Sequence, residues 1–343
     1  MNVDSNKKVN IIDTTLRDGD HAVNHSFSPE EAANIAQGLD RAGVRMIEAG
    51  HGDGLAGSSI QYGFSKYPEE EIHKAIVAVL THAKLCVLLL PGIGTMEELK
   101  VAYEIGAQAA RIATHCTEAD IAEQHIGLAK QLGMISIGAL MMVHMISPSE
   151  LAKQAKLMEA YGADLVYYMD SAGTLLPHQV KDRIEAARAT LKIPVGFHAH
   201  NNLSLAVANE LAAIEAGADY VDGCLRGLGA GSGNAQLEVL VAVLEKAGTE
   251  TGIDLYTVTD TAEKILEPLM KRPQVIDTAS LILGYSGVYS SFLLHTLRAA
   301  EKFNVDYRNV LVELGRRKTV GGQEDWIIEV CAEMADFARG RQT

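Results

Sequence analysis

Residues 9–19 read VNIIDTTLRDG, and this stretch decides how the rest of the chain is interpreted. The apolar run at its start predicts a buried strand, and the pair Arg17–Asp18 follows where that strand ends. Polar side chains directly after a buried parallel strand are typical of α/β enzymes, whose chemistry lies at the carboxyl ends of the strands. The same arrangement should therefore recur along the chain.

Short apolar runs alternate with amphipathic helical patterns through the first two thirds of the chain. Helix starts carry caps such as Ser28-Pro29-Glu30-Glu31, and Gly-Ala or Gly-Val pairs precede several of the apolar runs. The predicted strands are 9–15, 46–49, 85–90, 110–114, 135–141, 165–170, 195–200 and 220–225. Strand–helix units of this number within roughly 250 residues predict a (β/α)8 TIM barrel, with a doubly wound open sheet as the alternative.

The alternation stops after residue 244, and the remaining chain has mainly helical patterns. The predicted helices are 259–270, 290–303, 307–315 and 324–338, with Pro273, Gly284 and Gly287 as breaks. We therefore predict an α/β protein in two parts: a TIM-barrel catalytic domain, 1–255, and a smaller helical C-terminal domain, 256–343. The second part is expected to pack on the barrel as a lid or communication domain.

The composition excludes several classes of function. A formal net charge of −14 argues against binding of nucleic acid, which needs a basic surface. No apolar run approaches the ~18 residues of a membrane span, and the polar first ten residues lack the apolar segment of a signal peptide. Four cysteines without metal-binding or redox spacing fit a reducing compartment. We expect a cytoplasmic protein without a membrane or nucleic-acid partner.

The spacing of His198 and His200 points to a metal site, because residues two apart on a strand face the same side. Two imidazoles and the carboxylate of Asp18 are donors that suit a catalytic divalent cation. Arg17 beside them could hold a developing oxyanion. The leading hypothesis is a metal-dependent enzyme that makes or breaks carbon–carbon bonds. A surface Arg–Asp ion pair, or a core carboxylate Glu48 paired to Arg17 or a lysine, is the alternative interpretation.

Residues 13–19 also resemble the signature of the TIM-barrel superfamily that contains isopropylmalate synthases and hydroxymethylglutaryl-CoA lyases. Four further stretches resemble one branch, the 4-hydroxy-2-oxovalerate aldolases: 51–59 (HGDGLAGSS), 88–95 (LLLPGIGT), 227–234 (GLGAGSGN) and 287–292 (GVYSSF). The similarity covers nearly the whole chain. It implies a class II aldolase that cleaves 4-hydroxy-2-oxovalerate and related 4-hydroxy-2-oxoacids to pyruvate and an aldehyde such as acetaldehyde, in aromatic hydrocarbon catabolism.

The resemblance also implies roles for individual residues. Asp18, His198 and His200 would bind the cation, usually Mn²⁺, with Mg²⁺ and Co²⁺ as alternatives. Pyruvate would chelate that cation, so Asp18 and His198 count as substrate contacts too. Arg17 would stabilise the enolate, and His21 would act as the base on the C4 hydroxyl. Ser171 would contact the substrate carboxylate, and Tyr289 would close over the substrate. A neutral histidine near pH 7 suits the base.

The acceptor pocket follows from the residues themselves. Leu88 and Leu90 are two apart on the third strand and therefore share a face, with Leu90 nearer the mouth. We predict that they bound the pocket for the alkyl group of the aldehyde. Asp20, Asn24 and Asn201 depart from the family's pattern. Asp20 and Asn24 are expected to make the barrel mouth more negative than in the family, which leaves the preference for the aldehyde open.

Two rival functions remain. Claisen-type synthases of the superfamily usually carry Gly-Glu-Arg in the loop after the eighth strand, where this chain has Gly-Ala-Gly-Ser at 229–232. A catalytically silent scaffold is the other rival. The resemblance further implies an oligomer and a complex with an acylating acetaldehyde dehydrogenase that consumes the aldehyde. The apolar stripe of Phe292, Leu293, Leu294 and Leu297 is the expected interface.

Overall fold

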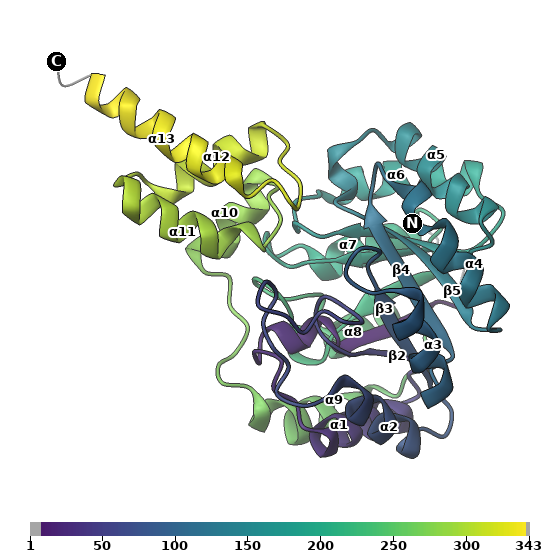
Figure 1. Cartoon of the computed structure of the whole chain (residues 1–343). Coiled ribbons are helices and arrows are strands. Elements are labelled where there is room, and N and C mark those ends of the chain that lie inside the picture. Colours follow the sequence, from purple (N-terminus) through teal and green to yellow (C-terminus); the bar gives the residue numbers. More distant parts are fainter. Residues whose placement is uncertain (1–7, 341–343) are drawn as a thin grey trace.

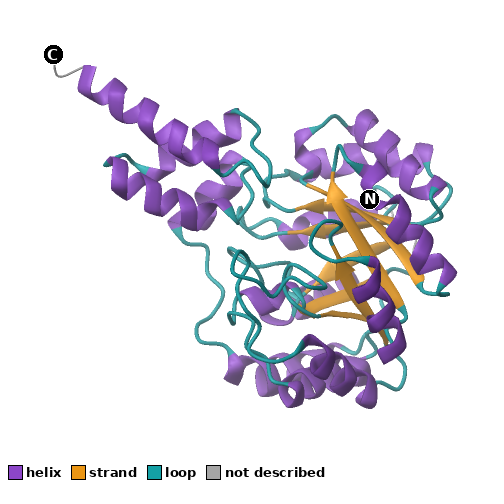
Figure 2. Cartoon of the chain, in the orientation of Figure 1, coloured by secondary structure: helices purple, strands orange, loops and turns teal. Residues whose placement is uncertain are grey.

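The computed structural model describes residues 8–340, with side chains to residue 337, and its larger part is a closed barrel of parallel strands (Figures 1 and 2). Each strand pairs with the next, and the last pairs with the first at Asn10 and Tyr220. The strands are β1(Asn10–Leu16), β2(Met46–Ala49), β3(Lys84–Leu89), β4(Ala109–His115), β5(Ile135–Met141), β6(Leu165–Asp170), β7(Val195–Ala199) and β8(Tyr220–Gly223). The predicted barrel is confirmed, and its closure excludes the open sheet.

Helices surround the barrel and begin where the sequence indicates. Ser28, Thr95 and Ser147 each form a capping box, and Gly43 ends the first helix in the left-handed conformation, with φ 97°. The helices are α1(Pro29–Ala42), α2(Glu69–Val79), α3(Met96–Ile105), α4(Glu123–Gln131), α5(Pro148–Ala160), α6(Pro177–Thr190), α7(Ala206–Glu215) and α8(Leu237–Lys246). Local caps thus fix where each connection returns to the barrel.

Both faces of the strands are buried, which explains why the strands read as continuous apolar runs. Ile12, Leu88 and Tyr167 belong to a core cluster inside the barrel. Ile47 and Leu89 belong to a larger cluster between the strands and the helices. Leu88 and Leu89 therefore point to opposite sides of the same strand, as the alternation of side chains requires.

The C-terminal part contains a second, smaller core. Its helices are α10(Thr278–Ser286), α11(Phe292–Phe303), α12(Tyr307–Arg316) and α13(Asp325–Gly340), and side chains such as Leu283 and Val330 pack among them. Before them, α9(Leu255–Thr261) continues as a π turn to Leu266, and Val258, Ala262 and Leu266 join the barrel's outer core. The boundary at 255/256 stays a prediction.

The sequence missed α10 because Gly284 and Gly287 were both interpreted as breaks. Gly287 does end the helix, with φ 68°. Gly284 lies inside it, and a Cβ there would come within 2.8 Å of the Cβ of Asn202 and 3.2 Å of the carbonyl oxygen of Gly173. This glycine therefore allows α10 to lie directly on the loops at the barrel mouth.

Among residues 8–340, no helix combines the length and the apolar composition that crossing a membrane requires. The polar N-terminal stretch that argued against a signal peptide extends into residues 1–7, which, like residues 341–343, lie outside the described part.

Candidate active site

Arg17 and Asp18 follow β1 in a short 3₁₀ turn, η1(Asp18–His21), at the mouth of the barrel. Arg17 donates through Nε to Glu48 Oε1 at 2.6 Å and through Nη1 to Asp18 Oδ1 at 2.8 Å. Burial alone would lower the pKa of Arg17, but Glu48 and Asp18 outweigh it and raise the pKa. Its Nη2 is buried and has no hydrogen-bond partner among the described residues. The guanidinium is thus fixed, charged and left with one unused edge.

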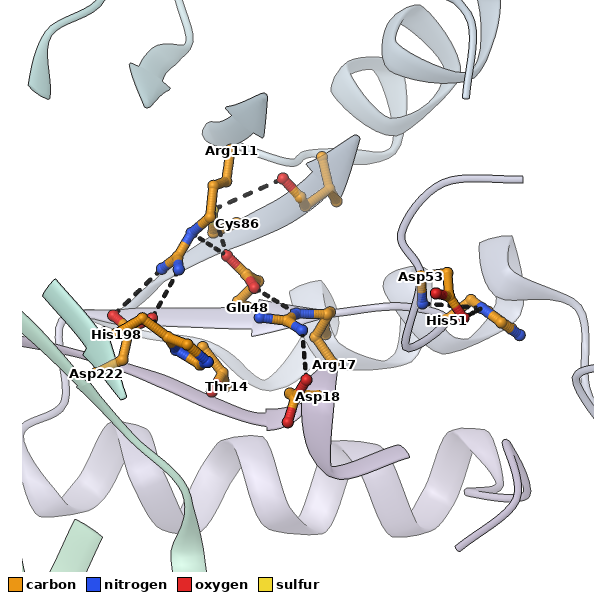
Figure 3. A network of polar contacts seen from close by, with 12 residues as sticks. Thr14, Arg17, Asp18, Glu48, His51, Asp53, Cys86, Arg111, His198 and Asp222 are labelled. Atoms are coloured by element: carbon orange, nitrogen blue, oxygen red, sulfur yellow. Dashed lines mark hydrogen bonds and ion pairs between the residues drawn. The ribbon is translucent and has the colours of Figure 1, made fainter. Parts of the chain in front are cut away.

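Behind Arg17 lies a chain of buried ion pairs that reaches His198 (Figure 3). Arg111 is fully buried, and its Nε lies 2.7 Å from Glu48 Oε2. Its Nη1 and Nη2 donate to the two carboxylate oxygens of Asp222 at 2.6 and 3.2 Å. Asp222 Oδ2 in turn lies 2.9 Å from Nδ1 of His198. Arg111, through Glu48 and Asp222, therefore links Arg17, the predicted oxyanion contact, to His198, a predicted metal ligand.

The contact with Asp222 sets the state of His198. An Nδ1–H that donates to the carboxylate leaves the lone pair on Nε2, and this atom is buried without a partner in the described part of the chain. A carboxylate behind a histidine is the usual support of a metal ligand. The ring of His200 lies 5.0 Å from that of His198, and burial lowers the pKa of His200 to about 4, so it is neutral at pH 7.

Asp18 supplies the negative charge of this donor set. Burial would raise its pKa, but His200 and Arg17 outweigh that effect and lower the pKa, so the carboxylate is ionised. Its Oδ2 accepts from Asn234 Nδ2 at 2.5 Å, so both oxygens already have partners. Within the described ranges, no group of three or more His, Cys, Asp or Glu side chains is arranged to hold a metal ion. The donor types themselves, one carboxylate and two imidazoles, fit a divalent cation.

His21 faces the same cavity from the end of η1 and is paired with Asp53. Its Nε2 lies 3.3 Å from Asp53 Oδ2, and 26% of its side chain is exposed. Burial lowers the pKa of His21, but the contact with Asp53 and the charge of Asp18 outweigh it and raise the pKa to about 9. The imidazole is therefore protonated at neutral pH in this arrangement, whereas the sequence led us to expect a neutral base.

A cavity of about 920 Å³ joins these groups at the barrel mouth, with walls from both parts of the chain. Most of the predicted site residues line it: Arg17, Asp18, His21, Leu88, Leu90, Ser171, His200 and Tyr289. His198 lies behind this surface and is only 1% exposed. Ser171 Oγ accepts a hydrogen bond from the backbone N–H of Met142 at 3.2 Å. The structure thus brings the predicted residues together around one volume.

Two expectations about the mouth need correction. Asn24 lines the cavity, but Asp20 does not; Asp20 is 7% exposed and pairs with Nδ1 of His25 at 3.3 Å. It therefore adds no charge to the cavity wall. In the apolar stripe, Phe292 is buried in the core of the helical part, whereas Leu294 and Leu297 are 55% and 38% exposed. Leu293 is partly buried, so Leu294 and Leu297 are the members of the stripe that are most open to a partner.

The sequence analysis missed the residues that hold the predicted site residues in place by contacting them. Arg111 and Asp222 stand in the middle of apolar strands, and a charge there must be paired because burying it alone costs several kcal/mol, about 3–5 when one partner is lost. That signal was present in the sequence. Asp53 and Asn234 lie in loops, and their positions in the sequence gave no comparable signal.

Fold and site together define a class, a (β/α)8 barrel enzyme with a carboxylate–imidazole cluster at its mouth and a helical part over it. Residues 8–265 match the HMGL-like family, and residues 274–336 match the DmpG-like communication domain. The chain is 62% identical over 329 residues to the 4-hydroxy-2-oxovalerate aldolase of Carboxydothermus hydrogenoformans, covering 96% of this chain and 98% of the relative. That of Moorella thermoacetica is 60% identical over 336 residues, covering 98% and 99%. The chain belongs to the 4-hydroxy-2-oxovalerate aldolase family, whose members are lyases.

A solved structure extends the comparison of the fold. The carboxyl transferase domain of Rhizobium etli pyruvate carboxylase with oxamate and biotin superimposes with a TM-score of 0.79, over 97% of this chain and 61% of that chain. At 17% sequence identity this likeness concerns the fold alone. Membership of the HMGL-like family, by contrast, implies a divalent metal ion.

Proposed function

We propose that this chain cleaves 4-hydroxy-2-oxovalerate and related 4-hydroxy-2-oxoacids to pyruvate and an aldehyde in the cavity at the barrel mouth. The observation that carries the proposal is the fixed guanidinium of Arg17, which has an unused, buried Nη2 and stands between Asp18 and Glu48. Breaking the C3–C4 bond leaves an electron pair that the C2 carbonyl takes up as an enolate. This step requires a fixed positive charge beside the enolate oxygen, and the guanidinium of Arg17 can supply it.

His21 is the proposed base. It takes the proton of the C4 hydroxyl as the aldehyde carbonyl forms. C3 of the enolate then takes up one proton in exchange, from the protonated His21 directly or through water, to give pyruvate and regenerate the base. The neutral form that this step needs is opposed by the charges of Asp18 and Asp53. Asp18 would hold a divalent cation, whose charge would compensate that of the carboxylate and so favour the neutral imidazole of His21. Asp53 keeps the ring turned toward the cavity.

Asp18, His198 and His200 are the proposed ligands of the cation, with Mn²⁺ ahead of Mg²⁺ and Co²⁺. The unpartnered Nε2 of His198 and the neutral state of His200 support this assignment. When bound, the cation supplies Lewis acidity to the keto oxygen, so that no Schiff-base lysine is needed.

The remaining cavity residues are proposed to hold and enclose the substrate. Ser171 would contact the substrate carboxylate, and Leu88 and Leu90 would bound the alkyl group of the aldehyde, since both side chains line the cavity. Tyr289 would cover the substrate from the helical part. Burial raises the pKa of its hydroxyl, with Asp53 and Asp18 adding to the effect, so the group stays neutral and can donate a hydrogen bond.

Release of pyruvate, coupled to lactate dehydrogenase, tests this function with 4-hydroxy-2-oxovalerate as substrate. We expect turnover that is lost in Asp18→Asn and retained in Asp182→Asn, whose carboxylate is exposed on α6. Release of a thiol from acetyl-CoA in the presence of a 2-oxoacid, without pyruvate formation, would instead identify a Claisen-type synthase. Absence of both reactions in metal-loaded protein would identify a scaffold.

We also propose an acylating acetaldehyde dehydrogenase as partner, in a cytoplasmic oligomer. The match of residues 274–336 to the DmpG-like communication domain supports a partner on the helical part. Four free, buried cysteines support a reducing compartment. Co-expression with a dehydrogenase from the same operon, followed by size-exclusion chromatography, should give one complex. Separate elution at micromolar concentration, with unchanged kinetics of both proteins, would show that the chain works alone.

A further inference from the structure

The helical part is fastened to the barrel by hydrogen bonds from the loop after β5. This loop forms a short turn, η3(Val143–Met145), and Nε2 of His144 lies 3.1 Å from the carbonyl oxygen of Gly287. Nζ of Lys318 donates to the carbonyl oxygen of Met145 at 3.3 Å. Gly287 is the left-handed residue that ends α10. Two bonds therefore join the loop to the helical part, one of them at the turn between α10 and α11.

The state of His144 makes its role in this contact definite. The partner is a carbonyl oxygen, which can only accept, so Nε2 must carry the proton. Burial lowers the pKa of His144 to about 4, and its Nδ1 is buried without a partner in residues 8–337, so the ring is neutral at pH 7. A neutral imidazole has a single N–H to donate, and here that N–H goes to Gly287.

The loop that carries His144 is itself held rigidly. Arg183 donates from Nε to the carbonyl oxygen of Val143 at 3.0 Å and from Nη2 to that of Ile146 at 3.1 Å. Met142 adopts a left-handed backbone with φ 56°, and its N–H donates to Oγ of Ser171. The same loop therefore touches a residue of the cavity wall at one end and the helical part at the other.

Gly287 stands two residues before Tyr289 in the chain. Val288 between them is buried in the helical core, and the carbonyl oxygen of Tyr289 accepts from the N–H of Phe292 at the start of α11. The backbone of Tyr289 is thus fixed on its C-terminal side by α11. On its N-terminal side it is fixed by the N–H groups of Gly287 and Val288, which donate to the carbonyl oxygen of Leu283, and by the bond between His144 and Gly287.

We propose that His144 is a positioning residue, which holds Tyr289 over the substrate cavity through its hydrogen bond to the carbonyl oxygen of Gly287. The proposal rests on the proposed function, because it assigns His144 an effect on catalysis that acts only through Tyr289. His144 does not line the cavity, and within the described residues its hydrogen bond goes to Gly287 and not to a proposed metal ligand.

A double-mutant cycle of His144→Phe and Tyr289→Phe tests the proposal, with kcat and KM for pyruvate release measured separately. Each single variant should lower kcat/KM by about tenfold, the effect of one well-placed hydrogen bond. If His144 acts through Tyr289, the double variant is no slower than Tyr289→Phe alone. His144→Gln, whose amide can occupy the place of Nε2, should restore kcat/KM to within about threefold of the parent.

Lys318→Met is the matched control, since it removes the other bond of the same loop at an exposed side chain. It should leave kcat and KM unchanged. Independent, multiplying losses in the double variant, a normal His144→Phe enzyme, or a Lys318→Met variant as slow as His144→Phe would each overturn the proposal. If His144→Phe fails to fold by circular dichroism, His144→Asn, too short to reach Gly287, replaces it in the cycle. Failure of the parent to release pyruvate would refute the proposed function instead.

Discussion

Replacing Arg17 by lysine tests the role of Nη2, the guanidinium nitrogen that has no hydrogen-bond partner among the described residues. The arginine spends Nε on Glu48 and Nη1 on Asp18, and only Nη2 is left for the substrate. A lysine keeps the charge but offers one nitrogen in place of three. It can pair with Glu48 or face the enolate, but it cannot do both in the same geometry. The loss should resemble that of one oxyanion donor, about 3–4 kcal/mol, or a factor of about 10²–10³ in kcat.

Pyruvate release by Arg17→Lys, saturated with substrate and metal, gives this factor directly. Thermal unfolding should change less than it would on loss of the charge, because a lysine can keep the buried ion pair with Glu48. Arg226→Lys is the control: this arginine also follows a barrel strand, but it pairs with Glu267 at 3.1 Å and does not line the cavity. If Arg17→Lys turns over within about threefold of the parent, the guanidinium is structural and does not stabilise the enolate.

Three further predictions concern the metal, the acceptor and stability. Chelation should abolish pyruvate release and Mn²⁺ should restore it; full turnover by protein verified as metal-free would remove the ligand assignment of Asp18, His198 and His200. Leu90→Ala should shift kcat/KM toward substrates that yield longer aldehydes, by about 1–3 kcal/mol at most, and an unchanged specificity profile would place the alkyl pocket elsewhere. Burial lowers the pKa of His73 from 6.5 to about 4, so the unfolded chain takes up a proton first as the pH falls. Stability should therefore decline from about pH 6.5 down to pH 4, by up to about 1.4 kcal/mol per pH unit for this residue. His73→Gln, which keeps a donor for the carbonyl of Ala49, should flatten the decline in the melting temperature, and parallel curves for both proteins would contradict this origin.

The barrel could be predicted from the sequence because a parallel strand buried on both faces appears as an apolar run, and because glycines such as Gly43 mark the helix ends. The rule that chemistry lies at the carboxyl ends of strands selected Arg17, Asp18 and His200, which do line one cavity. The missed helix α10 has a different cause. A glycine that permits a close approach cannot be told from one that ends a helix until the opposing surface is known.

The residues that orient the site residues could not be predicted from the sequence, because their partners become neighbours only in the folded chain. Arg111 and Asp222 are far apart in the sequence, and only the closed barrel brings the guanidinium against the carboxylate behind His198. The charge state of His21 likewise depends on Asp53, a loop residue whose neighbour the sequence does not reveal. Local patterns therefore identified which groups react, whereas the groups that orient them depend on tertiary structure.

The absence of a side chain at Gly284 sets a limit on domain exchange among relatives. A chimera that joins the barrel of one aldolase to the helical part of another must bring together a bare helix surface and the loops that contain Gly173 and Asn202. A single methyl group on that helix, as in Gly284→Ala, would lie 2.8 Å from the Cβ of Asn202, so the helix or the loop would have to shift. Transplanting the helical part should therefore require two donors that share this contact, in addition to the hydrogen bonds of His144 and Lys318.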